Sequence, residues 1–439
     1  LVIGMVMPVM STSWKLSVPR SDEATWPVIA TMGDESIWAL ARPVTRFVAP
    51  PYDVIDGPLE RALKNDRLNI THVTLGDQHD AYATAAKRLG TWLADEVMVR
   101  DGAEAFYLYE QTFKAPDGEP IARTGIVGLV RLEEFSKGTV LPHEMTIPKH
   151  KADRLALMTA IGGYAEQVFM LYDDPSGEVE RLIQGLRKRE ELLRFVDSDG
   201  VHHRIVRIGD EAAVRRITEL LGPLRLLIAD GHHRYETALK YRDTRRSEED
   251  PDGERPYDFI SATLVGFGNP GLVIYPTHRL VRGLPEDALD GLMGRLSGDF
   301  ELEPAAGPGE LVEALGRARS DAFGVWMPGK GVSALATPKR AGDGALGKLS
   351  VHVLQERVLK DVLGYTQDML DGKVDIEFVK GTEASMAAMA TGEHQACFFV
   401  KAPTTDQVME ASSSGEKMPQ KSTYFFPKIW SGTLLYMFG

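Results

Sequence analysis

One short stretch gathers side chains suited to holding phosphate. In IADGHHRYETALKYRD, an Asp-Gly pair, two histidines and an arginine stand between an apolar run and a helical pattern. A strand-to-helix turn of this kind presents the first backbone N–H groups of the helix at the sheet edge, where anions bind. Glycine allows close backbone approach, and the basic side chains add donors. The residues concerned are Asp230, Gly231, His232, His233 and Arg234.

A structural alternative needs no ligand at this turn. Asp230 would cap the helix, and the histidines would hydrogen-bond to neighbouring carbonyl groups. The similar stretch SDGVHHRIVRI precedes alternating apolar residues, so His202 and His203 are interpreted as surface or strand residues. Glu236 and Lys240, four residues apart on the expected helix, are interpreted as a surface pair without a catalytic role.

A second stretch, GTVLPHEMTIPKHKADRL, combines acids, bases and cations. Its two prolines predict a loop that stays out of helix before Lys151. Glu144 beside His143 could act as a general base or hold Mg²⁺. A solvated basic loop at a helix start is the alternative interpretation. The cations that could hold phosphate oxygens are Lys149, Lys151 and Arg154.

Three smaller stretches, APPYDVID, PTHRL and MPQKSTYFFPK, also carry polar candidates. Each could equally be structural, and Cys397 in ACFFV is predicted to be a buried hydrophobe rather than a nucleophile. The candidates are Tyr52, Asp53, His278, Arg279, Lys421, Ser422 and Thr423.

Composition excludes several classes of protein. The 439 residues include 50 basic and 63 acidic side chains, a net charge of -13, which argues against broad binding to nucleic acid or to anionic membranes. No apolar run approaches the roughly 20 residues of a membrane span. The single cysteine excludes a disulfide framework and a cysteine-based zinc site. These features predict a cytoplasmic protein.

Hydrophobic periodicity predicts alternating strands and helices. Helices are expected at 80–99, 151–163, 178–195, 211–221, 234–243 and 403–413, and strands at 105–113, 122–132, 166–174, 202–208, 224–229, 259–265, 271–281, 322–328, 332–337, 374–379 and 396–400. This pattern is typical of an α/β (mixed α+β) chain with mixed sheets. We expect a disordered or artefactual extension at 1–35, one region at 36–283 and a second, of unknown role, at 284–439.

Five of the quoted stretches resemble one family in order and spacing. APPYDVI, PHEMTIPKHKADRL, IADGHHRYETALKYRD, PTHRLV and MPQKSTYFFPK are similar to the domain-of-unknown-function 1015 family. More distantly, LPHE followed by DGHHR looks like the ParB/sulfiredoxin-like superfamily, particularly its free L-serine kinases. That resemblance implies a ParB/sulfiredoxin-like nucleotide-binding core in the first region. It also implies that Glu144 is the base toward a hydroxyl and that residues 230–234 hold nucleotide phosphates with Mg²⁺.

The chain departs from this pattern at several points. Its spacer between LPHE and DGHHR is longer than in the small serine kinases, and residues 290–439 have no counterpart there. Sulfiredoxin chemistry needs a cysteine at the turn, which this chain lacks. The acidic balance and the lack of an evident helix-turn-helix disfavour a DNA-bound CTPase.

We therefore expect a nucleotide-dependent phosphotransferase that modifies a small hydroxylated metabolite such as serine. Its cofactors would be ATP or ADP, with CTP possible, and Mg²⁺ held by Asp230 and Glu144. Two alternatives remain open: a nucleotide- or phosphate-binding protein without turnover, and a metal-dependent hydrolase with His143, Glu144, His232 and His233 as ligands. The sequence leaves the oligomeric state open.

Overall fold

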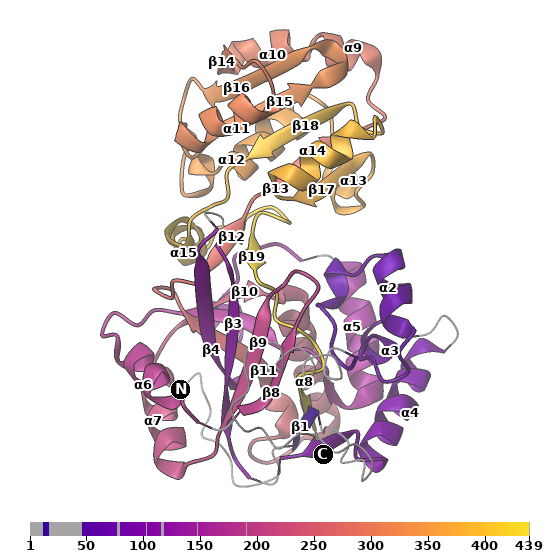
Figure 1. Ribbon diagram of the computed structural model, residues 1–439, viewed down its shortest axis with the longest axis vertical. Coiled ribbons are helices and arrows are strands. Elements are labelled where there is room, and N and C mark those ends of the chain that lie inside the picture. The colour runs from indigo at the N-terminus through magenta and orange to yellow at the C-terminus, as the bar shows by residue number, and fades with distance from the viewer. Residues whose placement is uncertain are drawn as a thin grey trace, which may run out of the picture. The chain divides into compact units, whose positions relative to one another are not determined.

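The chain folds into two compact units, each with its own sheets and core (Figure 1). The computed structural model describes residues 12–16, 46–76, 80–101, 103–115, 118–146, 148–189 and 191–438. Unit 1 comprises Leu1–Leu141, Pro148–Leu272 and Pro427–Gly439, and unit 2 comprises Pro142–Ile147 and Val273–Phe426. The described residues are mixed α/β, as expected.

The division differs from the expected boundary at residue 283 because two strands just before that point pair within unit 2. β12 (Val273–Tyr275) pairs with β19 (Tyr424–Phe426), and β13 (Thr277–Val281) lies between two other strands of the unit 2 sheet. The C-terminal residues after Phe426 return to unit 1.

Unit 1 is organised around an eight-stranded mixed sheet. In spatial order the strands are β5 (Val140–Leu141), β10 (Leu226–Asp230), β7 (Val168–Tyr172), β11 (Phe259–Gly266), β4 (Pro120–Arg131), β3 (Phe106–Lys114), β9 (His202–Ile208) and β8 (Glu191–Val196). Most neighbouring strands are antiparallel, but β7 is parallel to β11, and β5 is parallel to β10.

Helices bury their apolar faces against this sheet. One cluster joins side chains of the central strands to α6 (Glu178–Leu186), α7 (Glu211–Leu221) and α8 (His232–Glu249). The buried positions of α7 recur at helical spacing, which is why this helix was predicted with the correct bounds. The other long helices of unit 1 are α2 (Gly57–Lys64), α4 (Ala81–Ala94) and α5 (Pro148–Ile161), with the short α3 (Thr71–Thr74) between α2 and α4.

Several predicted elements needed correction. The helix expected at 80–99 ends at Ala94, because Met98–Arg100 form a short strand. The helix expected at 178–195 ends at Leu186, because the residues from Glu191 form β8 with Leu193 and Phe195 turned inward. Helix α8 runs to Glu249, beyond the expected end. Helix α5 begins at Pro148 rather than after it, since proline is tolerated in the first turn of a helix, where its missing N–H is not needed.

His203, interpreted as a strand or surface residue, lies on β9 but is buried. Its ring stacks on Phe195 with the centroids 4.2 Å apart, and its Nε2 lies 2.9 Å from Asp197 Oδ2. Burial lowers the pKa of His203, although Asp197 acts in the opposite direction. This histidine is therefore a core residue of unit 1.

A smaller sheet brings chain segments from both ends of unit 1 together. It comprises β2 (Met98–Arg100), β1 (Thr12–Leu16), β20 (Leu434–Met437) and β6 (Gly163–Tyr164). Strand β1 falls within the extension expected at 1–35, and the rest of that extension lies outside the described residues.

Unit 2 contains a six-stranded sheet with an apolar cluster on either side. In spatial order its strands are β14 (Phe300–Pro304), β16 (Val332–Pro338), β15 (Phe323–Met327), β18 (Ala396–Val400), β13 and β17 (Ile376–Lys380). Strand β14 was not predicted, because its pattern is largely exposed. Cys397 on β18 is fully buried, as predicted, and burial raises the pKa of its thiol.

The helices of unit 2 are α9 (Glu286–Asp290), α10 (Leu292–Asp299), α11 (Pro308–Arg317), α12 (Ser350–Val353), a π-helix (Leu354–Lys360), α13 (Gln367–Asp371), α14 (Thr382–Ala390) and α15 (Thr405–Ser413). Most of them contribute side chains to these two clusters, whereas α15 does not. Among the helices described in either unit, none is long and apolar enough to cross a membrane.

Candidate functional site

The turn between β10 and α8 has the geometry expected of an anion-binding turn. Gly231 adopts φ 95°, a left-handed conformation, and a Cβ atom there would lie 2.9 Å from Arg234 Nε. The N-cap position of α8 is Gly231, which has no side chain to cap the helix. Asp230 therefore does not occupy the N-cap position, as the structural alternative required, and His232 and His233 fall in the first turn, the former buried and the latter half-buried.

Asp230 instead faces two cations. Lys428 Nζ lies 3.2 Å from Asp230 Oδ2, and Arg234 Nη2 lies 3.7 Å from the same oxygen. Lys428 belongs to the C-terminal segment that returns to unit 1, and its backbone carbonyl accepts a hydrogen bond from Gln111 Nε2. The sequence analysis did not single out Lys428, although it is the last residue of the quoted MPQKSTYFFPK stretch.

Arg234 is held at the same point by its own partners. Its Nη1 donates to the backbone carbonyl of Gln167 over 2.6 Å. Burial opposes the charged form, but the nearby carboxylates, Glu166 and Asp230 foremost, keep the pKa of Arg234 above its ordinary value. The guanidinium is therefore a fixed positive charge beside the turn.

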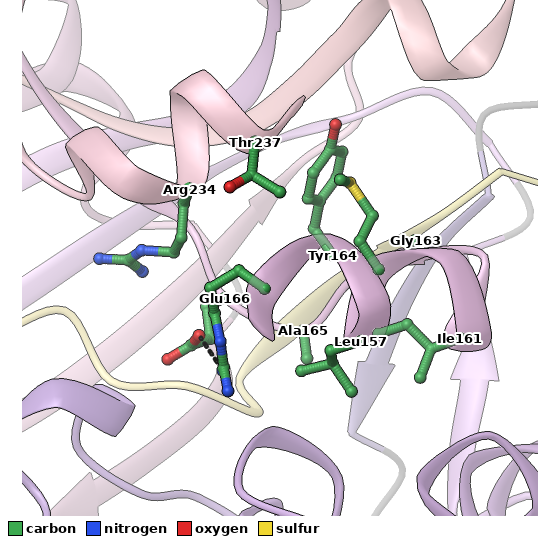
Figure 2. A pocket seen from close by; sticks show the side chains of 10 residues that line it. Leu157, Ile161, Gly163, Tyr164, Ala165, Glu166, Arg234 and Thr237 are labelled. Carbon is green, nitrogen blue, oxygen red and sulfur yellow. Dashed lines mark ion pairs between the residues drawn. The ribbon is translucent and has the colours of Figure 1, made fainter. Parts of the chain in front are cut away.

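A pocket lies between α5 and α8, next to this charge (Figure 2). Arg154, Glu166 and Arg234 line its charged side, and Thr237 contributes a hydroxyl. The apolar wall consists of Leu157, Met158, Ile161, Tyr164 and Ala165. The pocket has a volume of about 40 Å³, which is room for a water molecule or two and far below that of a typical small-molecule site.

Glu166, which was not predicted, ties four segments of unit 1 together. Its Oε1 accepts the backbone N–H of Tyr52 at 3.2 Å and the hydroxyl of Ser431 at 3.0 Å, and its Oε2 lies 3.8 Å from Arg154 Nη1. The Arg154 guanidinium stacks 4.0 Å from the centre of the Tyr52 ring. Burial, with Asp53 adding to it, raises the pKa of Tyr52. Tyr52 and Arg154 thus meet beside the pocket, while Asp53 is exposed.

Two other cations of the GTVLPHEMTIPKHKADRL stretch, Lys149 and Lys151, were also expected to hold phosphate oxygens. Lys151 Nζ pairs with Glu236 Oε2 at 2.8 Å, which joins α5 to α8 and replaces the expected Glu236–Lys240 surface pair. The side chain of Lys149 lies outside the described residues.

The remaining candidates gather in unit 2. Glu144 Oε1 accepts the backbone N–H of Lys421 at 2.9 Å, and His143 Nε2 lies 2.9 Å from Thr423 Oγ1. Ser422 donates its hydroxyl to the Pro419 carbonyl at 2.5 Å. These contacts hold the 142–147 segment beside the 418–423 segment.

Arg279 is a buried cation in the same unit. Its Nη2 lies 3.3 Å from the Lys421 carbonyl, and its guanidinium stacks 5.1 Å from the centre of the Phe378 ring. Burial lowers the pKa of Arg279 to about 9, although the charge of Glu144 opposes this.

The structure therefore assigns the predicted residues to two groups. Unit 1 holds Tyr52, Asp53, Lys151, Arg154 and residues 230–234, whereas unit 2 holds His143, Glu144, His278, Arg279 and residues 421–423. Within the described ranges, no group of three or more His, Cys, Asp or Glu side chains is placed to hold a metal ion.

His278 should make the stability of the protein depend on pH. Burial and the charge of Arg279 lower its pKa to about 3, and its Nδ1 accepts the N–H of Val400 at 3.1 Å. In the unfolded chain His278 becomes protonated below about pH 6.5, whereas in the folded protein its ring stays neutral down to about pH 3. Stability should therefore fall as pH falls through this window, by up to about 1.4 kcal/mol per unit.

Urea denaturation between pH 7 and pH 5 measures this dependence. The His278→Gln variant should be less stable at pH 7 but should show a slope smaller by nearly one proton. Equal slopes in the two proteins would show that His278 does not titrate in this way.

Comparison with known proteins gives a family and several distant structural similarities. The family model described as "Protein of unknown function (DUF1015)" matches residues 37–405. No curated protein sequence matches the chain.

The similar solved structures include a free serine kinase variant in complex with AMP, at 17% identity and TM-score 0.38, over 68% of this chain and 87% of the other. A second variant of that kinase, in complex with ADP, has 16% identity and TM-score 0.38, over 68% and 87%. A conserved hypothetical protein from Pyrococcus furiosus has 18% identity and TM-score 0.37, over 69% and 92%.

Proposed function

Given that the chain belongs to the DUF1015 family, we propose that it is a nucleotide-dependent phosphotransferase with a ParB/sulfiredoxin-like core, which moves a phosphoryl group to the free hydroxyl of a small metabolite such as serine. One observation carries the proposal: the uncapped start of α8, preceded by Gly231, is flanked by Arg234 and Lys428. Backbone N–H groups and fixed cations are the main requirements of phosphoryl transfer.

The nucleotide, ATP or ADP, would bind in unit 1. Its phosphates would lie at residues 230–234, at the start of α8. The pocket between α5 and α8, about 40 Å³ in volume, is too small for the base, so the phosphate contacts would carry most of the binding.

Mg²⁺ fits this turn only together with the nucleotide. Asp230 is the carboxylate that would hold it, but two cations already face Asp230, so a bare divalent ion would be repelled. Bound nucleotide phosphates would draw those cations away and supply the other oxygen ligands. The ion would neutralise charge on the phosphates during transfer.

Glu144 is proposed as the base, the role that the family resemblance implies. The hydroxyl oxygen of the acceptor would attack the terminal phosphorus, the bond from that phosphorus to the nucleotide oxygen would break, and the hydroxyl proton would pass to the carboxylate. The Lys421 N–H anchors one carboxylate oxygen of Glu144 within unit 2.

A ³¹P NMR time course tests the proposal. The protein is incubated with Mg²⁺ and, in turn, ATP, ADP and CTP, with a mixture of serine, threonine, homoserine and other hydroxy metabolites. A new phosphomonoester resonance that requires the acceptor supports transfer. Broadened nucleotide resonances without a product support the alternative, a nucleotide-binding protein without turnover, and a spectrum unchanged by the protein contradicts both.

Replacing His232 should lower turnover sharply. His232 is buried in the first turn of α8, beside the proposed phosphates, so His232→Ala should reduce turnover roughly 10²-fold. The melting temperature of the variant serves as its folding control. Normal turnover would remove His232 from the site.

A further inference from the structure

Basic side chains converge on the carboxylate of Asp230 more densely than one carboxylate requires. Lys428 and Arg234 both face its Oδ2, at 3.2 and 3.7 Å. Their side chains are only 11% and 10% exposed. Solvent therefore screens these charges weakly.

Arg123 adds a third positive charge from within the sheet. Its guanidinium lies 4.6 Å from the centre of the Phe169 ring, and Phe169 is the strand partner of Asp230. Its Nη2 donates to the carbonyl of Pro427, the residue before Lys428. Across the described residues, no acceptor lies within hydrogen-bonding reach of its Nη1.

Burial costs Arg123 part of its affinity for the proton. Its side chain is among the largest that are fully buried, and this burial lowers its pKa to about 9, although Tyr109 and Asp230 act in the opposite direction. A buried cation with an unpartnered donor is destabilising until an anion neutralises it.

The other carboxylates near the turn do not fully neutralise its three cations. Glu166 and Asp53 also face Arg234. Arg154, 3.8 Å from Glu166, pairs more closely with Asp153, so the charge of Glu166 offsets one of the three cations, whereas Asp53 is exposed to screening solvent. The buried surroundings of the turn therefore hold more positive than negative charge, and the uncapped start of α8 adds to it.

We propose that Asp230 is an internal counter-ion that holds the place of a ligand's terminal phosphoryl group. When a phosphoryl group binds, Lys428 and Arg234 turn to its oxygens together with the first N–H groups of α8, and Arg123 supports them from the sheet. Released from its cations, Asp230 can then face the Mg²⁺ of the nucleotide. The inference rests on the proposed function only for the identity of the ligand as a nucleotide.

Calorimetric titration with pyrophosphate in metal-free buffer tests this role. Asp230→Asn should bind pyrophosphate roughly 5- to 10-fold more tightly than the wild type, because the competing carboxylate charge is gone. Lys428→Met should bind it roughly 10-fold more weakly or worse, since one charge-assisted contact is lost. A site in which Asp230 simply positions its neighbours would lose affinity in Asp230→Asn instead.

Arg131→Met is the matched control. Arg131 lies on β4, the strand that also carries Arg123. Its guanidinium stacks 5.2 Å from the centre of the Phe259 ring, but it pairs with Glu254. Its replacement removes a comparable charge away from the turn and should leave pyrophosphate affinity unchanged. Melting temperatures verify that each variant folds.

The outcomes separate this inference from the proposed function. Unchanged or weaker pyrophosphate binding by Asp230→Asn, or no binding by the wild type, overturns the counter-ion role. Titration of the wild type with Mg²⁺ and ADP tests the nucleotide site independently. Tighter pyrophosphate binding by Asp230→Asn without any nucleotide binding supports the counter-ion and contradicts the nucleotide function.

Discussion

Replacing Glu144 with glutamine should reduce phosphoryl transfer roughly 10²-fold or more without unfolding the protein. Glutamine cannot take a proton from the acceptor hydroxyl, but its side-chain oxygen can still accept the Lys421 N–H that Glu144 Oε1 accepts at 2.9 Å. Turnover is measured by the growth of the phosphomonoester resonance, and stability by the melting temperature.

Glu144→Ala separates a base from a structural anchor. Alanine removes both the base and the hydrogen-bond acceptor, so this variant should lose activity and also melt earlier. If Glu144→Gln keeps normal turnover while Glu144→Ala only melts earlier, Glu144 is an anchor of the 142–147 segment, and the base must be sought elsewhere.

Replacing Glu166 with alanine should lower the free energy of unfolding by about 2–3 kcal/mol. The substitution removes the acceptor of the Tyr52 N–H and the Ser431 hydroxyl, and it removes one carboxylate near Arg154, which keeps its ion pair with Asp153. Urea denaturation measures the loss. A change below about 1 kcal/mol would show that water replaces the carboxylate at little cost.

Glu166→Gln is the control for this effect. Its amide oxygen can still accept hydrogen bonds from Tyr52 and Ser431, but it no longer balances the charge of Arg154. We expect an intermediate loss of about 1–2 kcal/mol. If Glu166→Gln lost as much stability as Glu166→Ala, the missing negative charge would account for the whole effect.

Local patterns predicted many of the elements but not all of their ends. Helix α7 shows apolar residues at helical spacing, and β18 is an uninterrupted apolar run, so both were recognised. The helix expected at 178–195 failed because ELLRFV suits either state, and its pairing with β9 decides in favour of a strand. Pairing partners that are distant in sequence carry no local signal.

The candidate site was only partly predicted, again because partners that are distant in sequence carry no local signal. Residues 230–234 stand at a turn that short-range chemistry alone specifies, with a glycine that the left-handed conformation requires. Lys428, Glu166 and Arg123 were missed because each contacts a residue far away in the sequence: Lys428 contacts Asp230, Glu166 contacts Tyr52, and Arg123 contacts Pro427.

By itself, the sequence determined the mixed α/β class, the family and the strand-to-helix turn that begins α8, because these depend on composition, motif order and local periodicity. Only the tertiary structure decided that Glu144 belongs to unit 2 and that the last residues of the chain return to unit 1 with Lys428. The physical reason is that two charged residues can meet inside the fold however far apart they stand in the sequence. Burial makes an unpaired charge costly, so the fold brings distant partners together.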